Sequence, residues 1–301
     1  MMNAHEFARL RDYIHRHSGI HLGEDKQYLV ENRLSPIMAL SGCRDFSDLL
    51  LKLQTDDGTL RAKVIDAMST NETLWFRDES LFSALERDIV PELVRRARRR
   101  TVRIWSAACS TGQEPYSLAM LIDDALRREV GADPSRFEIL GTDLSGTALQ
   151  LARSGCYSQL ALSRGMRPGF RERYFHRDGL SFELDSSIRE RVTFRPFNLQ
   201  EPFSALGRIA VQKFDLILCR NVLIYFDKKL KGDVYGRLAG VLRDDGLLAI
   251  GASESINGVS DAFVRTPYGK GVLYRPAARS TTRIGIPSHD TSLSANARAR
   301  A

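Results

Sequence analysis

The fold is decided by the stretch Val102-Arg103-Ile104-Trp105-Ser106-Ala107-Ala108-Cys109-Ser110-Thr111-Gly112-Gln113-Glu114-Pro115-Tyr116-Ser117. It opens with a short apolar run, continues through a loop of small residues and enters a helical pattern near Glu114 and Pro115. A strand that passes through such a loop into a helix is typical of parallel α/β sheets. The stretch therefore predicts that an α/β domain begins at about residue 101.

The same alternation continues along the chain. Apolar runs at 102–105, 137–140, 192–194, 214–218 and 247–250 are separated by helical stretches at 115–130, 146–153 and 228–242. This pattern favours a parallel sheet covered on both faces. Two further runs, 263–265 and 271–274, have only a Pro/Gly turn between them, which predicts a closing antiparallel hairpin.

Other segments differ in character. We expect a helical domain over 1–68, a linker and lead-in helix over 69–100, an α/β domain over 101–276 with a small, partly β-stranded insertion at about 154–191, and a disordered tail over 277–301. The helical domain is predicted because its apolar residues repeat at helical spacing. The insertion is predicted because residues 154–191 are too many for a simple connection. The tail is predicted because it is rich in Ser, Thr, Ala and Arg.

Composition excludes several classes of protein. No apolar run reaches the roughly 18 residues that span a bilayer, and no signal peptide is recognisable, so a cytoplasmic location without membrane insertion is expected. The four cysteines are scattered, which argues against a zinc site or redox dithiol. The net charge of +7 comes from an arginine cluster at 95–100 and from the tail. We interpret the cluster as a solvated helix end, so nucleic acid is not an expected partner.

Polar motifs follow the predicted strands, where ligands bind in open α/β sheets. The glycine-rich dinucleotide pattern is absent after the first strand, and Glu114 suits a cationic small ligand better than a pyrophosphate. Asp143, after the second strand, is placed to accept hydrogen bonds from ribose hydroxyls, although aspartate is also a common helix cap. Polar groups also follow the run at 214–218, within 219–226, and the linker 68–77 mixes polar and aromatic residues. Ordinary turns and helix starts remain open alternatives for each motif taken alone.

Four motifs together resemble one family. Thr70-Asn71-Glu72-Thr73 with Phe76-Arg77, the stretch 105–117, the stretch 219–227 and Ser253-Glu254-Ser255 are similar to the CheR-type chemotaxis receptor glutamate methyltransferases. The resemblance extends in order from about His5 to Arg275. It implies a small all-helical N-terminal domain followed by a Rossmann-like α/β domain that depends on S-adenosylmethionine and carries an inserted small β-subdomain.

The resemblance also implies a set of site residues and no metal. The expected cofactor contacts are Asn71, Thr73 and Arg77 from the linker, Glu114 for the methionine ammonium, Asp143 for the ribose, Asn198 and Leu199 for the adenine, and Arg220 and Asn221 at the reactive end. Arg77 and Tyr225 are the expected catalytic residues. The sequence departs from the family at Gln113, often Glu, and at Trp75, often Phe. Cys109 and Cys219 are expected to flank the cofactor.

The implied reaction transfers a methyl group to glutamate carboxylates on the cytoplasmic helices of chemotaxis receptors. The products are glutamate methyl esters and S-adenosylhomocysteine, and the enzyme is expected to be a monomer. A carboxylate with a pKa of about 4.3 is ionised at neutral pH, so no general base is required. Positioning and electrostatics would supply catalysis, with Arg77 orienting the substrate's or the cofactor's carboxylate and Tyr225 shaping the methyl pocket.

Two other functions compete with this hypothesis. One is methylation of another acceptor such as nucleic acid, although the Pro-Pro-Tyr/Phe motif of amino-methylating DNA enzymes is absent here. The other is a non-catalytic module that binds the cofactor as a signal. By resemblance the helical domain binds the receptor, yet residues 1–70 hold nine Lys/Arg against ten Asp/Glu. Attraction to an acidic helix would need one face, such as that of Lys26 and Arg33.

Overall fold

The computed structural model describes residues 2–129, 131, 133–207 and 211–277, so all but the first residue of the predicted tail lies outside them. Its N-terminal part is a bundle of four helices, α1 (Ala4–Ser18), α2 (Gln27–Leu40), α3 (Phe46–Thr55) and α4 (Thr59–Met68), with a short 3₁₀ turn at Glu24–Lys26. The bundle packs around its own apolar cluster, in which Leu10, Ile14 and Leu34 are fully buried. Within the described ranges, no helix combines the length and hydrophobicity needed to cross a membrane.

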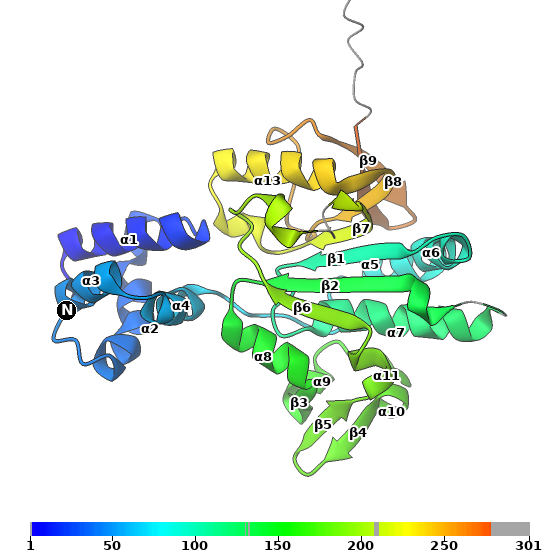
Figure 1. The fold of residues 1–301 in the computed structure, drawn as a ribbon, viewed down its shortest axis with the longest axis horizontal. Coiled ribbons are helices and arrows are strands. Elements are labelled where there is room, and N and C mark those ends of the chain that lie inside the picture. The colour runs from blue at the N-terminus through cyan, green and yellow to red at the C-terminus, as the bar shows by residue number, and fades with distance from the viewer. Residues whose placement is uncertain (1, 130, 132, 208–210, 278–301) are drawn as a thin grey trace, which may run out of the picture.

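The main sheet has seven strands in the order β6-β2-β1-β7-β8-β10-β9 (Figure 1). Five are parallel: β1 (Val102–Ala107), β2 (Phe137–Asp143), β6 (Val192–Pro196), β7 (Phe214–Cys219) and β8 (Leu242–Ala249). The last two, β9 (Phe263–Tyr268) and β10 (Gly271–Pro276), form an antiparallel hairpin. The parallel sheet and the closing hairpin are thus confirmed. Because β1 lies between β2 and β7, the strand order reverses at β1, and this reversal is where such sheets bind ligands.

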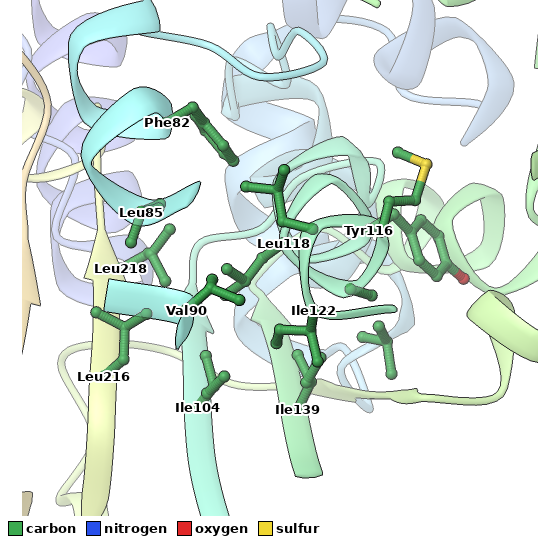
Figure 2. Close-up of a cluster of buried hydrophobic side chains, with 14 of the residues drawn as sticks. Phe82, Leu85, Val90, Ile104, Tyr116, Leu118, Ile122, Ile139, Leu216 and Leu218 are labelled. Carbon is green, nitrogen blue, oxygen red and sulfur yellow. The ribbon is translucent and has the colours of Figure 1, made fainter. Parts of the chain in front are cut away.

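Both faces of the sheet are covered. The covering helices are α5 (Glu79–Ala84), a π-helical turn (Leu85–Ile89), α6 (Val90–Ala97), α7 (Gln113–Arg128), α8 (Gly146–Ser154) and α13 (Lys228–Val241), with short 3₁₀ turns at Pro134–Arg136, Phe203–Leu206 and Leu223–Tyr225. Alternate strand residues point to opposite faces. Ile104, Ile139 and Leu216 share a cluster with Phe82 and Leu118 from α5 and α7 (Figure 2). The next residue along each strand packs on the other face: Trp105, Leu140 and Ile217. There they share a cluster with Val234 and Leu238 of α13.

A second, smaller sheet interrupts the α/β domain. Its antiparallel strands are β3 (Cys156–Ser158), β5 (Ser181–Leu184) and β4 (Phe175–Asp178), accompanied by α9 (Gln159–Ser163), α10 (Phe170–Tyr174) and α11 (Ser186–Arg189). This sheet confirms the inserted β-subdomain, while the domain limits at 68, 101, 154 and 191 stay predictions. Trp75 fastens the linker to it, because its backbone N–H donates to Arg164 and its indole N–H to the Ala161 carbonyl, both at 3.1 Å. A phenylalanine at this position would lack the second bond.

The arginine cluster before β1 is in part a buried network. Asp215 of β7, whose side chain is fully buried, accepts bonds of 2.9 and 2.5 Å from Arg100 and one of 3.0 Å from the Arg103 backbone N–H. Arg96 and Arg243 lie 3.6 and 3.7 Å from the same carboxylate. The expectation of a solvated helix end is therefore wrong for Arg96 and Arg100, which anchor the lead-in helix to the sheet.

Asp215→Asn should lower the free energy of unfolding by about 1.5–3 kcal/mol, because charge-assisted bonds to a buried carboxylate are lost. Glu138→Gln is the matched control, since Glu138 also pairs with an arginine of β1 but is half exposed. That change should cost less than about 1 kcal/mol. Urea unfolding of the two variants measures the difference. Equal effects would show that the Asp215 network does not support the sheet.

Candidate cofactor site

A cavity opens at the carboxyl ends of β1, β2 and β7 and encloses about 910 Å³, its open mouth included. All ten residues predicted for the site line it: Asn71, Thr73, Arg77, Glu114, Asp143, Asn198, Leu199, Arg220, Asn221 and Tyr225. The structure thus brings the linker, the helix start and three loops together at the strand-order reversal. The contact that each residue makes with a cofactor stays a prediction.

The backbone around this cavity is strained. Six described residues other than glycine have a positive φ, and five of them lie in loops at the cavity: Phe76, Asp78, Ala108, Ser110 and Asn221. Left-handed backbone in such residues costs of order 1–3 kcal/mol each and persists only where the surroundings impose it. Specific contacts must therefore hold these loops.

Asp143 holds one of them. Its carboxylate accepts the backbone N–H of Ser110 at 2.7 Å and that of Ser145 at 2.9 Å. Burial raises the pKa of Asp143, and these two hydrogen bonds oppose the rise. Ser110 is left-handed, with φ of 50°. Asp143 therefore builds the loop after β1 as well as lining the cavity, and each oxygen still has a lone pair for a ribose hydroxyl.

Glu114 and Arg220 form a buried ion pair. Arg220 Nη1 donates to Glu114 Oε2 at 2.8 Å, and Ser106 Oγ donates to Oε1 at 2.7 Å. Arg220 Nη2 also lies 3.9 Å from Asp78 Oδ2. Two carboxylates therefore surround one guanidinium, and Arg220 only partly offsets the charge of Glu114. Each oxygen retains capacity for a second bond, so the predicted contact with an ammonium group fits. Gln113 is not among the lining residues, and its side chain accepts a bond from Thr111 instead.

Arg220 also positions Arg77. Its Nη2 donates to the backbone carbonyl of Arg77 at 2.6 Å, while Arg77 Nη1 donates to the Glu72 carbonyl at 3.0 Å. The left-handed residues Phe76 and Asp78 flank Arg77 on either side. The linker is therefore fixed over the cavity, and the guanidinium of Arg77 keeps further N–H donors for a ligand.

The helical bundle completes the cavity wall, which the sequence did not predict. Ser18 and Ile20 line the cavity. At the end of α1, Asn198 Nδ2 donates to the His17 carbonyl at 2.9 Å, and Gln200 Nε2 donates to the His15 carbonyl at 3.2 Å. The bond from Asn198 reaches one of the carbonyls near the end of α1 that lack a partner within the helix. The His15 carbonyl also accepts the backbone N–H of Gly19 at 2.8 Å, so the bond from Gln200 is a second one. Since the amide of Asn198 is used in this way, an adenine contact would involve its backbone or its remaining hydrogen-bonding capacity.

Of the two cysteines predicted at the site, only one lines the cavity. Cys109 lines the cavity, and burial raises its pKa well above the ordinary value. Cys219 is buried in the cluster beneath α13 and is not among the lining residues, so its predicted place beside the cofactor is wrong. No cluster of three or more potential His, Cys, Asp or Glu ligands for a metal occurs in the described part of the chain.

The cavity fits a charged nucleoside ligand. The loop at the carboxyl end of β1 has only small side chains, those of Ala108, Cys109 and Ser110, so a ligand can approach its backbone. Asp143 offers hydrogen-bond acceptors beside this loop. Phe197 and Leu199 supply apolar surface for a base on the neighbouring wall. This combination of apolar wall and few polar groups is typical of small-molecule sites.

Gly19→Ala should weaken binding of S-adenosylhomocysteine by about tenfold, which is about 1.4 kcal/mol. Gly19 has φ of 76°, a conformation that strains an alanine, and an added Cβ would lie 2.8 Å from Leu230 and 3.1 Å from Phe226, so either these side chains or the end of α1 must shift. Gly42→Ala is the control, because its φ is 63° and nothing lies within 4 Å of the added atom. Calorimetry should show a loss of affinity for Gly19→Ala alone. Equal affinities would mean that the position of the end of α1 does not affect ligand binding.

Comparison with known proteins identifies the family. The CheR methyltransferase all-alpha domain matches residues 5–69, and the CheR methyltransferase SAM binding domain matches residues 71–271. Chemotaxis protein methyltransferase 1 of Pseudomonas aeruginosa is 42% identical over 271 residues, which cover 90% of this chain and 97% of that protein. Chemotaxis protein methyltransferase Cher2 of Pseudomonas putida is 41% identical over 272 residues, with 90% and 97% covered. The chemotaxis protein methyltransferase of Salmonella typhimurium is 35% identical, with 87% and 88% covered. This chain therefore belongs to the CheR family of S-adenosylmethionine-dependent methyltransferases.

Proposed function

We propose that this enzyme methylates glutamate side chains on the cytoplasmic helices of chemotaxis receptors, forming methyl esters and S-adenosylhomocysteine. The observation that carries the proposal is the single cavity that gathers all ten predicted residues, with Arg77 and Tyr225 among them. The similarity to relatives named chemotaxis protein methyltransferases covers nearly their full length, which supports a receptor as the substrate. A cytoplasmic location, a monomeric state and the absence of a metal remain part of the same proposal, as the sequence and its family resemblance imply them.

The chemistry of the cavity suits a substrate that is already a nucleophile. S-adenosylmethionine, when bound, supplies an activated methyl group. A glutamate carboxylate is ionised at neutral pH, so the protein need not remove a proton. No histidine is among the described lining residues, and the raised pKa of buried Cys109 keeps its thiol protonated. The carboxylates of Glu114 and Asp143 are held by other partners, so the site suits a substrate that is already ionised.

Arg77 and Tyr225 are the residues we assign to orientation. Arg77 has its backbone clamped by Arg220, so its guanidinium is presented from a fixed point. Tyr225 is partly exposed at the cavity lining, and its backbone carbonyl accepts the His21 N–H at 2.7 Å. A guanidinium fork pairs well with a carboxylate, and the tyrosine ring shapes the space around the transferred methyl group.

Lys26 and Arg33, the basic residues suggested for receptor recognition, both have partners within the bundle. Arg33 Nη1 donates to the Met68 carbonyl at 2.8 Å and so closes the end of α4. Lys26 forms a surface pair with its neighbour Asp25, at 2.8 Å. Arg33 therefore supports the bundle, whereas Lys26 remains on the surface, where a receptor contact stays a prediction.

The direct test incubates the full-length enzyme with labelled S-adenosylmethionine and receptor cytoplasmic fragments. Label should enter the receptor fragment and leave it as methanol on mild base treatment, because methyl esters hydrolyse readily. Fragments whose candidate glutamates are changed to alanine should accept no label. Base-stable label would indicate another acceptor atom, and binding of cofactor without any transfer would support a non-catalytic module.

Arg77→Ala should lower turnover by about 10- to 150-fold, which is about 1.5–3 kcal/mol for a lost charge-assisted contact. The dissociation constant of S-adenosylhomocysteine should change less than turnover. Arg77→Lys should rescue activity only in part, because an ammonium cannot make the planar two-point contact. Steady-state kinetics and calorimetry separate the two effects. Full activity of the lysine variant would exclude a bidentate role.

A further inference from the structure

The turn after β8 carries a glutamate that the cofactor site does not account for. Glu254 donates its backbone N–H to the Gly251 carbonyl at 2.9 Å, which closes a tight turn. Its side chain folds back, and Oε2 accepts the backbone N–H of Gly251 at 2.7 Å and that of Asn221 at 2.8 Å. One carboxylate oxygen therefore bridges the ends of the neighbouring strands β7 and β8.

The bonded residue Asn221 is in the left-handed conformation, with φ of 57°. Its side chain lies against Gly251, because a Cβ on that glycine would be 2.6 Å from Asn221 Nδ2 and 2.7 Å from Glu254 Oε2. Only a residue without a side chain leaves space for this arrangement. Asn221, Gly251 and Glu254 thus form a close-packed unit, named below the β7–β8 clasp.

The clasp controls where the reactive end of the cavity lies. Asn221 follows Arg220, whose side chain reaches Glu114 and the Arg77 carbonyl. It precedes the short 3₁₀ turn Leu223–Tyr225, which brings Tyr225 to the cavity. The backbone torsions at Asn221 therefore set the relative positions of residues on either side of it. If Asn221 relaxed to a right-handed conformation, Arg220 and Tyr225 could not both keep their places.

We propose that Glu254 is a positioning residue for methyl transfer, which holds Asn221 left-handed and so fixes the reactive end of the cavity. Glu254 is not among the lining residues and acts through the backbone of Asn221. The inference rests on the proposed function for its turnover measurement alone, because cofactor binding can be measured without an acceptor.

The geometry specifies the hydrogen-bond acceptor rather than the charge. Both N–H donors meet Oε2, whereas Oε1 is buried without a hydrogen-bond partner among the described residues. A glutamine can present its carbonyl oxygen to the two donors and leave its NH₂ group in the place of Oε1. An alanine leaves both N–H groups without this acceptor and removes the hold on Asn221.

The test compares E254A, E254Q and G251A with G236A as control. Gly236 lies in α13, has no positive φ and has nothing within 4 Å of an added Cβ. The measurements are the transfer rate to receptor fragments at saturating cofactor, the KM for cofactor, and the dissociation constant of S-adenosylhomocysteine by calorimetry. Thermal melts of each variant set the assay temperature below its transition.

E254A and G251A should reduce the saturating transfer rate by about 10- to 100-fold, the scale of a misplaced reacting group. They should also weaken binding of S-adenosylhomocysteine by a smaller factor. E254Q should stay within about threefold of the wild type, as should G236A. If E254A does not fold, the contrast between E254Q and G251A decides, because both retain an acceptor at position 254.

Wild-type rates in E254A or G251A would overturn the proposal, and so would an E254Q variant as impaired as E254A. In the latter case the charge, not the position of the acceptor, would matter. If the wild-type enzyme labelled no receptor fragment, the proposed function would fail. The dissociation constants of S-adenosylhomocysteine would still decide the role of Glu254, because an unchanged constant in both E254A and G251A contradicts it.

Discussion

The guanidinium of Arg220 is the group on which the site depends. Its side chain is 2% exposed, and it donates to Glu114 and to the backbone carbonyl of Arg77. A buried charge left without its partners costs several kcal/mol. The start of α7, the linker and the end of β7 therefore favour one joint arrangement, because displacement of the helix or the linker would remove one of the partners of the buried guanidinium. A buried ion pair adds little stability by itself, but here it penalises the alternative arrangements.

The same device recurs around the cavity. At each loop, a charged side chain from one strand end bonds to the backbone of a neighbouring segment. Asp143 at the end of β2 holds Ser110 after β1, Glu254 after β8 holds Asn221 after β7, and Arg220 holds the linker. Each of these contacts reaches a left-handed residue or the neighbour of one. The strain in the loops is thus offset by bonds from outside them, so the loops are shaped before any ligand arrives.

Much of this arrangement could be predicted from the sequence because it follows from local periodicity. Alternating apolar runs and helical stretches predicted the parallel sheet, and the ends of parallel strands meet at one edge. That rule, together with the family resemblance, was enough to predict that Glu114, Asp143 and Asn221 lie around one site. Local rules also explain the one misplaced cysteine. Cys219 ends a strand in which side chains alternate between faces, and it falls on the face beneath α13.

Contacts between segments far apart in the chain had no such signal. The bond from Asn198 to His17 joins residues 181 positions apart, and neither residue type predicts it. The arginine partners of Glu114 and Asp215 could not be predicted either, because the sequence does not show whether an acidic side chain is solvated by water or paired with an arginine. The turn at 251–254 shows a third limit. Its glycine is required by the side chain of Asn221, a neighbour that only the folded chain supplies.

The attachment of α1 has a consequence for how the enzyme comes apart. Two carbonyls near the end of that helix accept bonds from side chains of the segment after β6, and Ser18 and Ile20 form part of the cavity. A molecule in the cavity touches both the bundle and the sheet, so its binding energy is available only while the two remain joined. A ligand in the cavity should therefore couple the unfolding of the bundle to that of the sheet, and local unfolding at the end of α1 should expose the cavity.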